Sequence, residues 1–171
     1  MQAVISLFIE LCLLRTTPQR LPAAPVLLGL TLAANLLVGA LMIQSTRGSF
    51  LAALIESLAD TGLALGVLQL GLVAVKRRER FLQAGTAILG AGTLLGVVGL
   101  LLLSIHIPSN EPSDLADFLS VLWLLLLAWN ILVLAHILRH TFDLKFGSGL
   151  GLAVLYTLLS VLINGLLFPL N

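Results

Sequence analysis

The sequence predicts an all-α, polytopic membrane helix bundle with five transmembrane helices and a short N-terminal interfacial helix. Three observations carry this prediction. Apolar residues make up 59% of the 171 residues and charged residues 10%, whereas soluble domains average about 45–50% and about 25%. The mean hydropathy is +1.12, too high for a single soluble core to bury the chain. The apolar residues also fall into five runs separated by charged or polar turns.

Each of the five runs has the length that a membrane crossing needs. A hydrocarbon core about 30 Å thick takes roughly 20 residues of helix. The runs cover residues 25–43, 50–75, 81–107, 116–138 and 146–170. The second and third runs are separated by the block 76–80, Lys-Arg-Arg-Glu-Arg, which no helix would place in hydrocarbon. No run shows the in-out alternation of a transmembrane strand, so helix is the expected form.

Residues 1–24 are expected to form a separate cytoplasmic segment before the transmembrane domain of residues 25–171. Residues 1–14 are apolar except for Gln2, Ser6 and Glu10, whose spacing of four makes one polar stripe on a helix. Fourteen helical residues extend about 21 Å, too short to span a bilayer. We expect this helix to lie in the membrane interface, and a helix packed on the bundle surface is an equal alternative. Prolines at 18, 22 and 25 then predict an extended connector.

The basic residues indicate the orientation. With five spans, eight of the nine lysines and arginines fall on one side of the membrane, and the ninth, Arg47, falls on the other. An excess of Lys and Arg marks cytoplasmic loops, so the N-terminus is expected in the cytoplasm and the C-terminus across the membrane. The eight on the cytoplasmic side are Arg15, Arg20, Lys76, Arg77, Arg78, Arg80, Arg139 and Lys145.

Pairs of glycines predict a contact between the second and third spans. Gly62 and Gly66 lie at GxxxG spacing in the second span, and Gly92 and Gly96 do so in the third. Small residues let helix backbones approach closely in lipid, and the short basic turn joins these two spans. The expected arrangement is a tight antiparallel pair at the centre of the bundle.

Glu56 and Asp60 form the candidate polar intramembrane site. They lie four residues apart, so they share one face of the second span. Ionised carboxylates at that depth are costly unless they are paired or wetted. In a functional interpretation, the two line a polar cleft that binds a proton, a cation or a cationic group. In a structural one, Glu56 reaches the headgroups and Asp60 hydrogen-bonds to a neighbouring helix.

Other function classes find no support in the sequence, and we expect no enzyme. There is no nucleophile elbow, zinc-protease helix or phosphate-binding glycine loop, and no cofactor or nucleic acid is expected. His106 could join the two carboxylates at a metal, but His136 and His140 lie half a bilayer away, so no metal site is expected. Cys12 has no second cysteine to pair with, and an apolar packing role is favoured over acylation.

Four segments together are similar to a known family: residues 21–25 (Leu-Pro-Ala-Ala-Pro), the acidic second span, residues 77–83 (Arg-Arg-Glu-Arg-Phe-Leu-Gln) and residues 136–140 (His-Ile-Leu-Arg-His). The chain resembles the Yip/Yif family of small five-span membrane proteins and looks like a compact bacterial-type member. Nothing here matches the cytoplasmic Asp-Leu-Tyr-Gly-Pro motif of the family's eukaryotic members, so the family's association with GTPases and vesicle traffic is not carried over.

The sequence thus leaves two hypotheses for function. The first is a non-enzymatic membrane scaffold of Yip-like architecture, a partner of other components of the bilayer. The alternative is a small transport or channel subunit that uses Glu56 and Asp60 as a proton- or cation-binding pair. The short termini and the resemblance favour a bacterial inner membrane. The ligand, the partner and the oligomeric state are left open.

Overall fold

In the computed structural model, which describes residues 2–105 and 114–169, every regular element is a helix. The elements in chain order are α1 (Gln2–Cys12), the 3₁₀ turn η1 (Pro18–Arg20), α2 (Pro25–Arg47), α3 (Phe50–Ala74), the 3₁₀ turn η2 (Arg78–Arg80), α4 (Phe81–Leu103), α5 (Asp114–Phe142) and α6 (Phe146–Leu167). Five of them are long and apolar enough to cross a membrane, which confirms the predicted helical architecture and suggests a multi-pass membrane protein.

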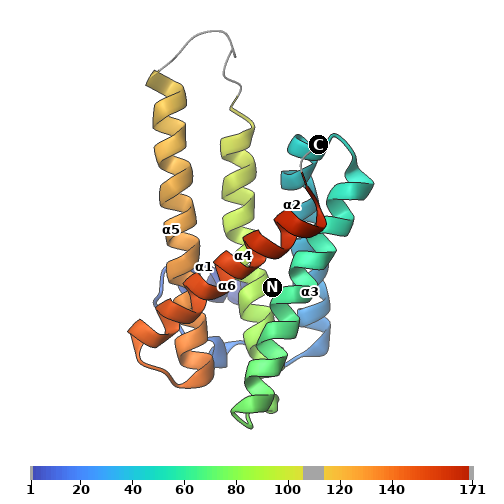
Figure 1. The fold of residues 1–171 in the computed structure, drawn as a ribbon. Helices are drawn as coiled ribbons and strands as arrows, with labels where there is room; N and C mark the ends of the chain where they lie inside the picture. Colours follow the sequence, from blue (N-terminus) through green and yellow to red (C-terminus); the bar gives the residue numbers. More distant parts are fainter. Residues whose placement is uncertain (1, 106–113, 170–171) are drawn as a thin grey trace.

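Successive long helices run in opposite directions, and α6 crosses the bundle obliquely, from the end of α5 towards the α2–α3 turn (Figure 1). The turn at 76–80 and the connector at 143–145 therefore lie at the same end of the bundle. We call this the basic end, because it holds Lys76, Arg77, Arg78, Arg80 and Lys145. The end of α2 and the end of α6 meet at the opposite end.

Two helices are longer than the hydropathy pattern predicts. Helix α2 continues past residue 43 to Arg47 and stops at Gly48, whose φ of 68° is the left-handed conformation that commonly ends helices. Helix α5 covers Asp114–Phe142 rather than 116–138, with acidic residues in its first turn and basic residues in its last. Both charges favour the helix dipole, so these polar residues belong to the helix although hydropathy excludes them.

The small residues of α3 and α4 pack on α2, which contacts both helices along its length. A Cβ on Gly96 would lie 2.7 Å from Val38, and one on Gly92 would lie 3.0 Å from Asn35. On α3 the buried small face is Ala53, Ser57 and Thr61, at a spacing of four. Gly39 of α2 packs against this face, and a Cβ on Gly39 would lie 2.5 Å from the Ser57 hydroxyl oxygen.

The expected glycine-to-glycine pairing of the second and third spans is therefore wrong. Gly62 and Gly66 lie on an exposed face of α3, and a Cβ on either would meet no atom within 4 Å. The physical reason is helix phase: Gly62 follows Thr61 by one residue, a rotation of about 100° away from the packed face. Helices α3 and α4 meet nearer the basic end, where Leu68 and Leu72 pack with Ala84.

Helix α1 packs against the bundle, which was one of the two expectations for it. Phe8, Leu11 and Cys12 are buried against α4 and α5, and a Cβ on Gly90 would lie 2.2 Å from the Phe8 ring. Trp129 of α5 donates its indole N–H to the Cys12 carbonyl at 3.0 Å, and this satisfies one of the free carbonyls at the end of α1. Ile5, Ile9 and Leu13 form the outward, apolar face.

The side chain of Cys12 is buried in this contact, with its sulfur 4.0 Å from the Ala91 carbonyl oxygen. Burial raises the pKa of the thiol to about 11, because an apolar environment disfavours the thiolate. The thiolate is the nucleophilic form, so the environment of Cys12 supports the packing role rather than acylation.

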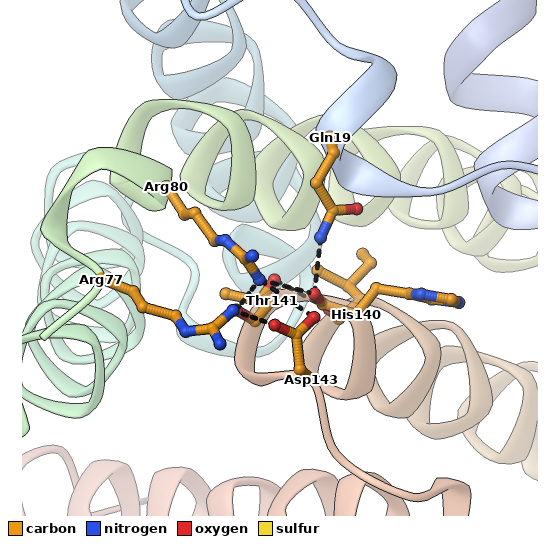
Figure 2. A network of polar contacts seen from close by, with 7 residues as sticks. Gln19, Arg77, Arg80, His140, Thr141 and Asp143 are labelled. Atoms are coloured by element: carbon orange, nitrogen blue, oxygen red, sulfur yellow. Dashed lines mark hydrogen bonds and ion pairs between the residues drawn. The ribbon is translucent and has the colours of Figure 1, made fainter. Parts of the chain in front are cut away.

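A cluster of polar contacts fastens the basic end (Figure 2). Arg80 donates to the carbonyl oxygens of His140 and Thr141 at 3.3 and 3.0 Å, and it lies 3.1 Å from Asp143. Arg77 pairs with the same carboxylate. Asp143 has a positive φ of 53° at the end of α5. The turn between α3 and α4 thus satisfies the final carbonyls of α5, which have no partner within their own helix.

The glycine contacts predict opposite outcomes for two matched substitutions. Gly96→Ala should lower the free energy of unfolding by about 1–3 kcal/mol, because overfilling a tight contact displaces Val38 and the α2 backbone. Gly62→Ala should leave it unchanged or raise it by up to about 1 kcal/mol, since alanine favours the helix and meets open space. Unfolding by SDS in mixed micelles measures both. Equal destabilisation by the two would contradict this packing.

Candidate functional site

The candidate site is a polar cleft at the end of the bundle opposite the basic end. It is a cavity of about 1000 Å³ among α2, α3, α4 and α6, with Trp123 of α5 in its wall. Its walls are apolar towards Val38 and Met42 and strongly polar towards α3 and α6. Its polar lining includes Asn35 and Arg47 from α2, Glu56, Asp60 and Thr61 from α3, and Ser160 and Asn164 from α6.

Arg47 and Glu56 form an ion pair at the outer rim of the cleft. Arg47 Nε lies 2.7 Å from Glu56 Oε2, and the two side chains are 17% and 15% exposed. The same guanidinium donates to the Pro169 carbonyl oxygen at 3.0 Å and to the Phe168 carbonyl oxygen. Arg47 therefore neutralises Glu56 and caps the C-terminal end of α6, where the helix dipole favours a cation.

Asp60 lies one helical turn further along α3 and has neutral partners. Ser160 Oγ and Asn164 Nδ2 both donate to Asp60 Oδ1, the amide at 3.0 Å. Asn164 Nδ2 also donates to Ser160 Oγ at 3.3 Å. All of these bonds to the carboxylate end on Oδ1, so among the described residues Oδ2 keeps its capacity to accept a hydrogen bond or a cation.

Polar groups continue from Asp60 towards the middle of the bundle. Thr61 Oγ1 donates to Asn35 Oδ1 at 3.2 Å, and Asn35 Nδ2 donates to the Leu89 carbonyl at 3.4 Å. A smaller cavity of about 150 Å³ shares Asn35, Asp60 and Thr61 with the cleft and adds Asn130 and Tyr156. The polar surface thus reaches from the end of the bundle to residues near the midpoints of α4 and α5.

The charges that line the cleft do not cancel. Its walls contain one cation, Arg47, and two carboxylates, Glu56 and Asp60. Since Arg47 is paired with Glu56, the negative charge of Asp60 is met by hydrogen bonds alone. A carboxylate without a cationic partner is costly within a membrane, and a bound cation offsets that cost.

The structure brings Glu56 and Asp60 to one cleft and gives them different environments. Asp60 has the contacts of the structural interpretation, with hydrogen bonds to α6, and it also faces the cavity of the functional one. The role of Arg47 was missed in the sequence. It lies nine residues before Glu56 across the Gly48–Ser49 turn, and that spacing was the available signal.

The histidines lie outside this cleft as far as the structure describes them. His106 falls outside the described residues. His136 Nε2 hydrogen-bonds to the Thr16 carbonyl at 2.8 Å, and its ring packs edge-on against His140 with centroids 4.7 Å apart. Within residues 2–105 and 114–169, no group of three His, Cys, Asp or Glu residues is placed to hold a metal ion.

Comparisons with known proteins add no relative. No family model matches the chain, and neither a curated protein nor a solved structure matches it.

A double-mutant cycle tests the rim of the cleft. Arg47→Gln should lower the free energy of unfolding by about 2–4 kcal/mol, because it leaves Glu56 and the end of α6 without their partner. Glu56→Gln alone should cost less, since Arg47 keeps its carbonyl contacts.

In the double variant, Arg47→Gln with Glu56→Gln, the loss should be smaller than the sum of the two by about 1–2 kcal/mol. Titration with SDS in mixed micelles gives the three values. Strict additivity would show that the two side chains do not interact.

Proposed function

We propose that this protein is a small multi-pass membrane transport or channel subunit that binds a proton or a small cation at Asp60. The observation that supports the proposal is the uncompensated carboxylate on the wall of a cavity of about 1000 Å³. A cavity lined by one unmatched negative charge favours cations electrostatically, and low-dielectric walls strengthen that preference.

Three further features favour a ligand over a purely structural role for Asp60. Its oxygen Oδ2 remains available, the neighbouring acid is already neutralised by Arg47, and Asn35, Asn130 and Tyr156 extend the polar surface inwards. Ionisable residues that face a cavity within a membrane typically mark ion or proton pathways. A scaffold, the first hypothesis from the sequence, would require none of these features.

The family, cellular location and partners also belong to this proposal. We infer a Yip-like protein of a bacterial inner membrane from the four sequence segments alone, with the bilayer as its environment and no catalytic activity. A second membrane protein as a partner stays a prediction, and it is the competing outcome of the experiment that follows.

Substitution of Asp60 tests the proposed site. Purified protein in liposomes should dissipate an imposed proton, sodium or potassium gradient, measured with an internal pH- or cation-sensitive dye. Asp60→Asn should reduce that flux at least tenfold, because the amide removes the charge while it retains an oxygen for Ser160 and Asn164. Elution volume and helical content should be unchanged.

Asp117→Asn is the matched control, since Asp117 is exposed in the first turn of α5 and does not line the cleft. Its flux should equal that of the unmodified protein. The proposal fails if the unmodified protein moves none of the three ions, or if Asp60→Asn moves them as fast. A membrane protein that co-purifies in mild detergent with both forms would then support the scaffold hypothesis.

We also propose that the basic end faces the cytoplasm, which places the mouth of the cleft across the membrane. The segregation of eight basic residues from Arg47 supports this orientation. An alkaline phosphatase fused after Asn171 should be active, and a fluorescent protein that matures in the cytoplasm should be dark there. The same two reporters inserted between residues 77 and 78 should give the opposite result. If a reporter behaved alike at both sites, five crossings would be refuted.

A further inference from the structure

Another cavity lies at the basic end, and its lining is apolar where that of the cleft is polar. It is a groove of about 290 Å³ between α3 on one side and α5 and α6 on the other, with Ile88 of α4 among its lining residues. Val67 and Gly71 line the α3 side, and Leu138 and Phe142 line the α5 side. Tyr156 is the one polar residue among its lining residues. The groove lies between helices that are each apolar enough to stand in hydrocarbon.

The mouth of the groove is basic. Its lining ends at Val75, just after α3, and at Leu144, after α5. Each of these residues is followed directly by an exposed lysine, Lys76 and Lys145. Lys76 has a positive φ of 57°, where the chain turns out of α3. Asp143 is already paired with Arg77 and Arg80. Within the described part of the chain, neither lysine makes a hydrogen bond or ion pair through its side chain.

The charge around this mouth exceeds what the local acids neutralise. The turn and the connector contain five basic residues against two acidic ones, Glu79 and Asp143. Basic clusters at the cytoplasmic surface of a membrane attract anionic lipid headgroups. A free phosphate ion would account for the lysines but not for the apolar groove that continues from them into the membrane.

We propose that this groove binds one anionic phospholipid, with an acyl chain between α3 and α5–α6 and the headgroup phosphate between Lys76 and Lys145. The acyl chain exchanges one hydrocarbon environment for another, so the hydrophobic effect adds little preference. Selectivity for anionic over zwitterionic lipid comes from the two lysines, and retention comes from the concave apolar walls. Lipid binding here presupposes neither a cation at Asp60 nor transport activity.

Native mass spectrometry of the full chain, titrated with dioleoyl phosphatidylglycerol or dioleoyl phosphatidylcholine, tests this site. One phosphatidylglycerol should bind more tightly than phosphatidylcholine. Each surface lysine contributes about fivefold to the binding of anionic lipid, so Lys76→Gln with Lys145→Gln should weaken that complex about 25-fold and abolish the preference. Arg15→Gln with Arg20→Gln removes the same charge from exposed positions outside the groove and should change neither.

A second pair of variants tests the groove itself. Ala74→Trp should fill it and weaken the binding of both lipids, whereas Ala52→Trp, on an exposed position at the other end of the same helix, should not. If a variant fails to fold, a photoreactive phosphatidylglycerol on the unmodified chain replaces it, with crosslinks expected in residues 64–75 and 134–144. The proposal is overturned if the lysine variant retains the preference for phosphatidylglycerol, or if the arginine control loses as much affinity as the lysine variant. It is also overturned if inorganic phosphate competes with the lipid, or if the crosslinks form elsewhere.

Discussion

Two arginines, one at each end of the bundle, donate hydrogen bonds to backbone carbonyls at or just beyond the C-terminal end of a helix from another part of the chain. Arg80 donates to the last carbonyls of α5 and meets Asp143. Arg47 donates to the carbonyls that follow α6 and meets Glu56. Near hydrocarbon, unsatisfied backbone groups cost several kcal/mol each, and a helix end has no internal partner for them. These two contacts tie the last hairpin, α5 and α6, to the rest of the bundle.

Between those ends the packing depends on α2 rather than on the paired glycines of neighbouring spans. Small side chains on both α3 and α4 face α2, and Gly39, Ala53 and Ser57 bring the α2 and α3 backbones together. Close approach on that face places Asn35 within reach of Thr61. Helix α6 contacts α3 over a shorter length, which leaves room for the polar cleft on the side of α3 where Asp60 lies.

Much of this architecture follows from the sequence, and its limits have physical causes. Hydropathy and charge segregation define five helices, because each crossing must be apolar and each turn must be solvated. They do not define helix phase, so GxxxG spacing suggests a contact for Gly62 and Gly66 that the neighbouring Thr61 makes instead. They give Glu56 and Asp60 a shared face, but not the arginine on the preceding helix that separates their environments. The groove was not predictable, because it arises where three distant segments leave a gap.

The two cavities are adjacent although their chemistry is opposite. Ala64, Ile88, Leu134 and Tyr156 line both the apolar groove and the inner extension of the polar cleft. Tyr156 begins the polar stripe on α6 that continues through Ser160 and Asn164 to Asp60. A lipid chain in the groove would therefore lie against the same side chains that close the inner end of the polar path. Since α6 carries this stripe on one face and exposed leucines on others, a displacement of α6 would change both cavities together.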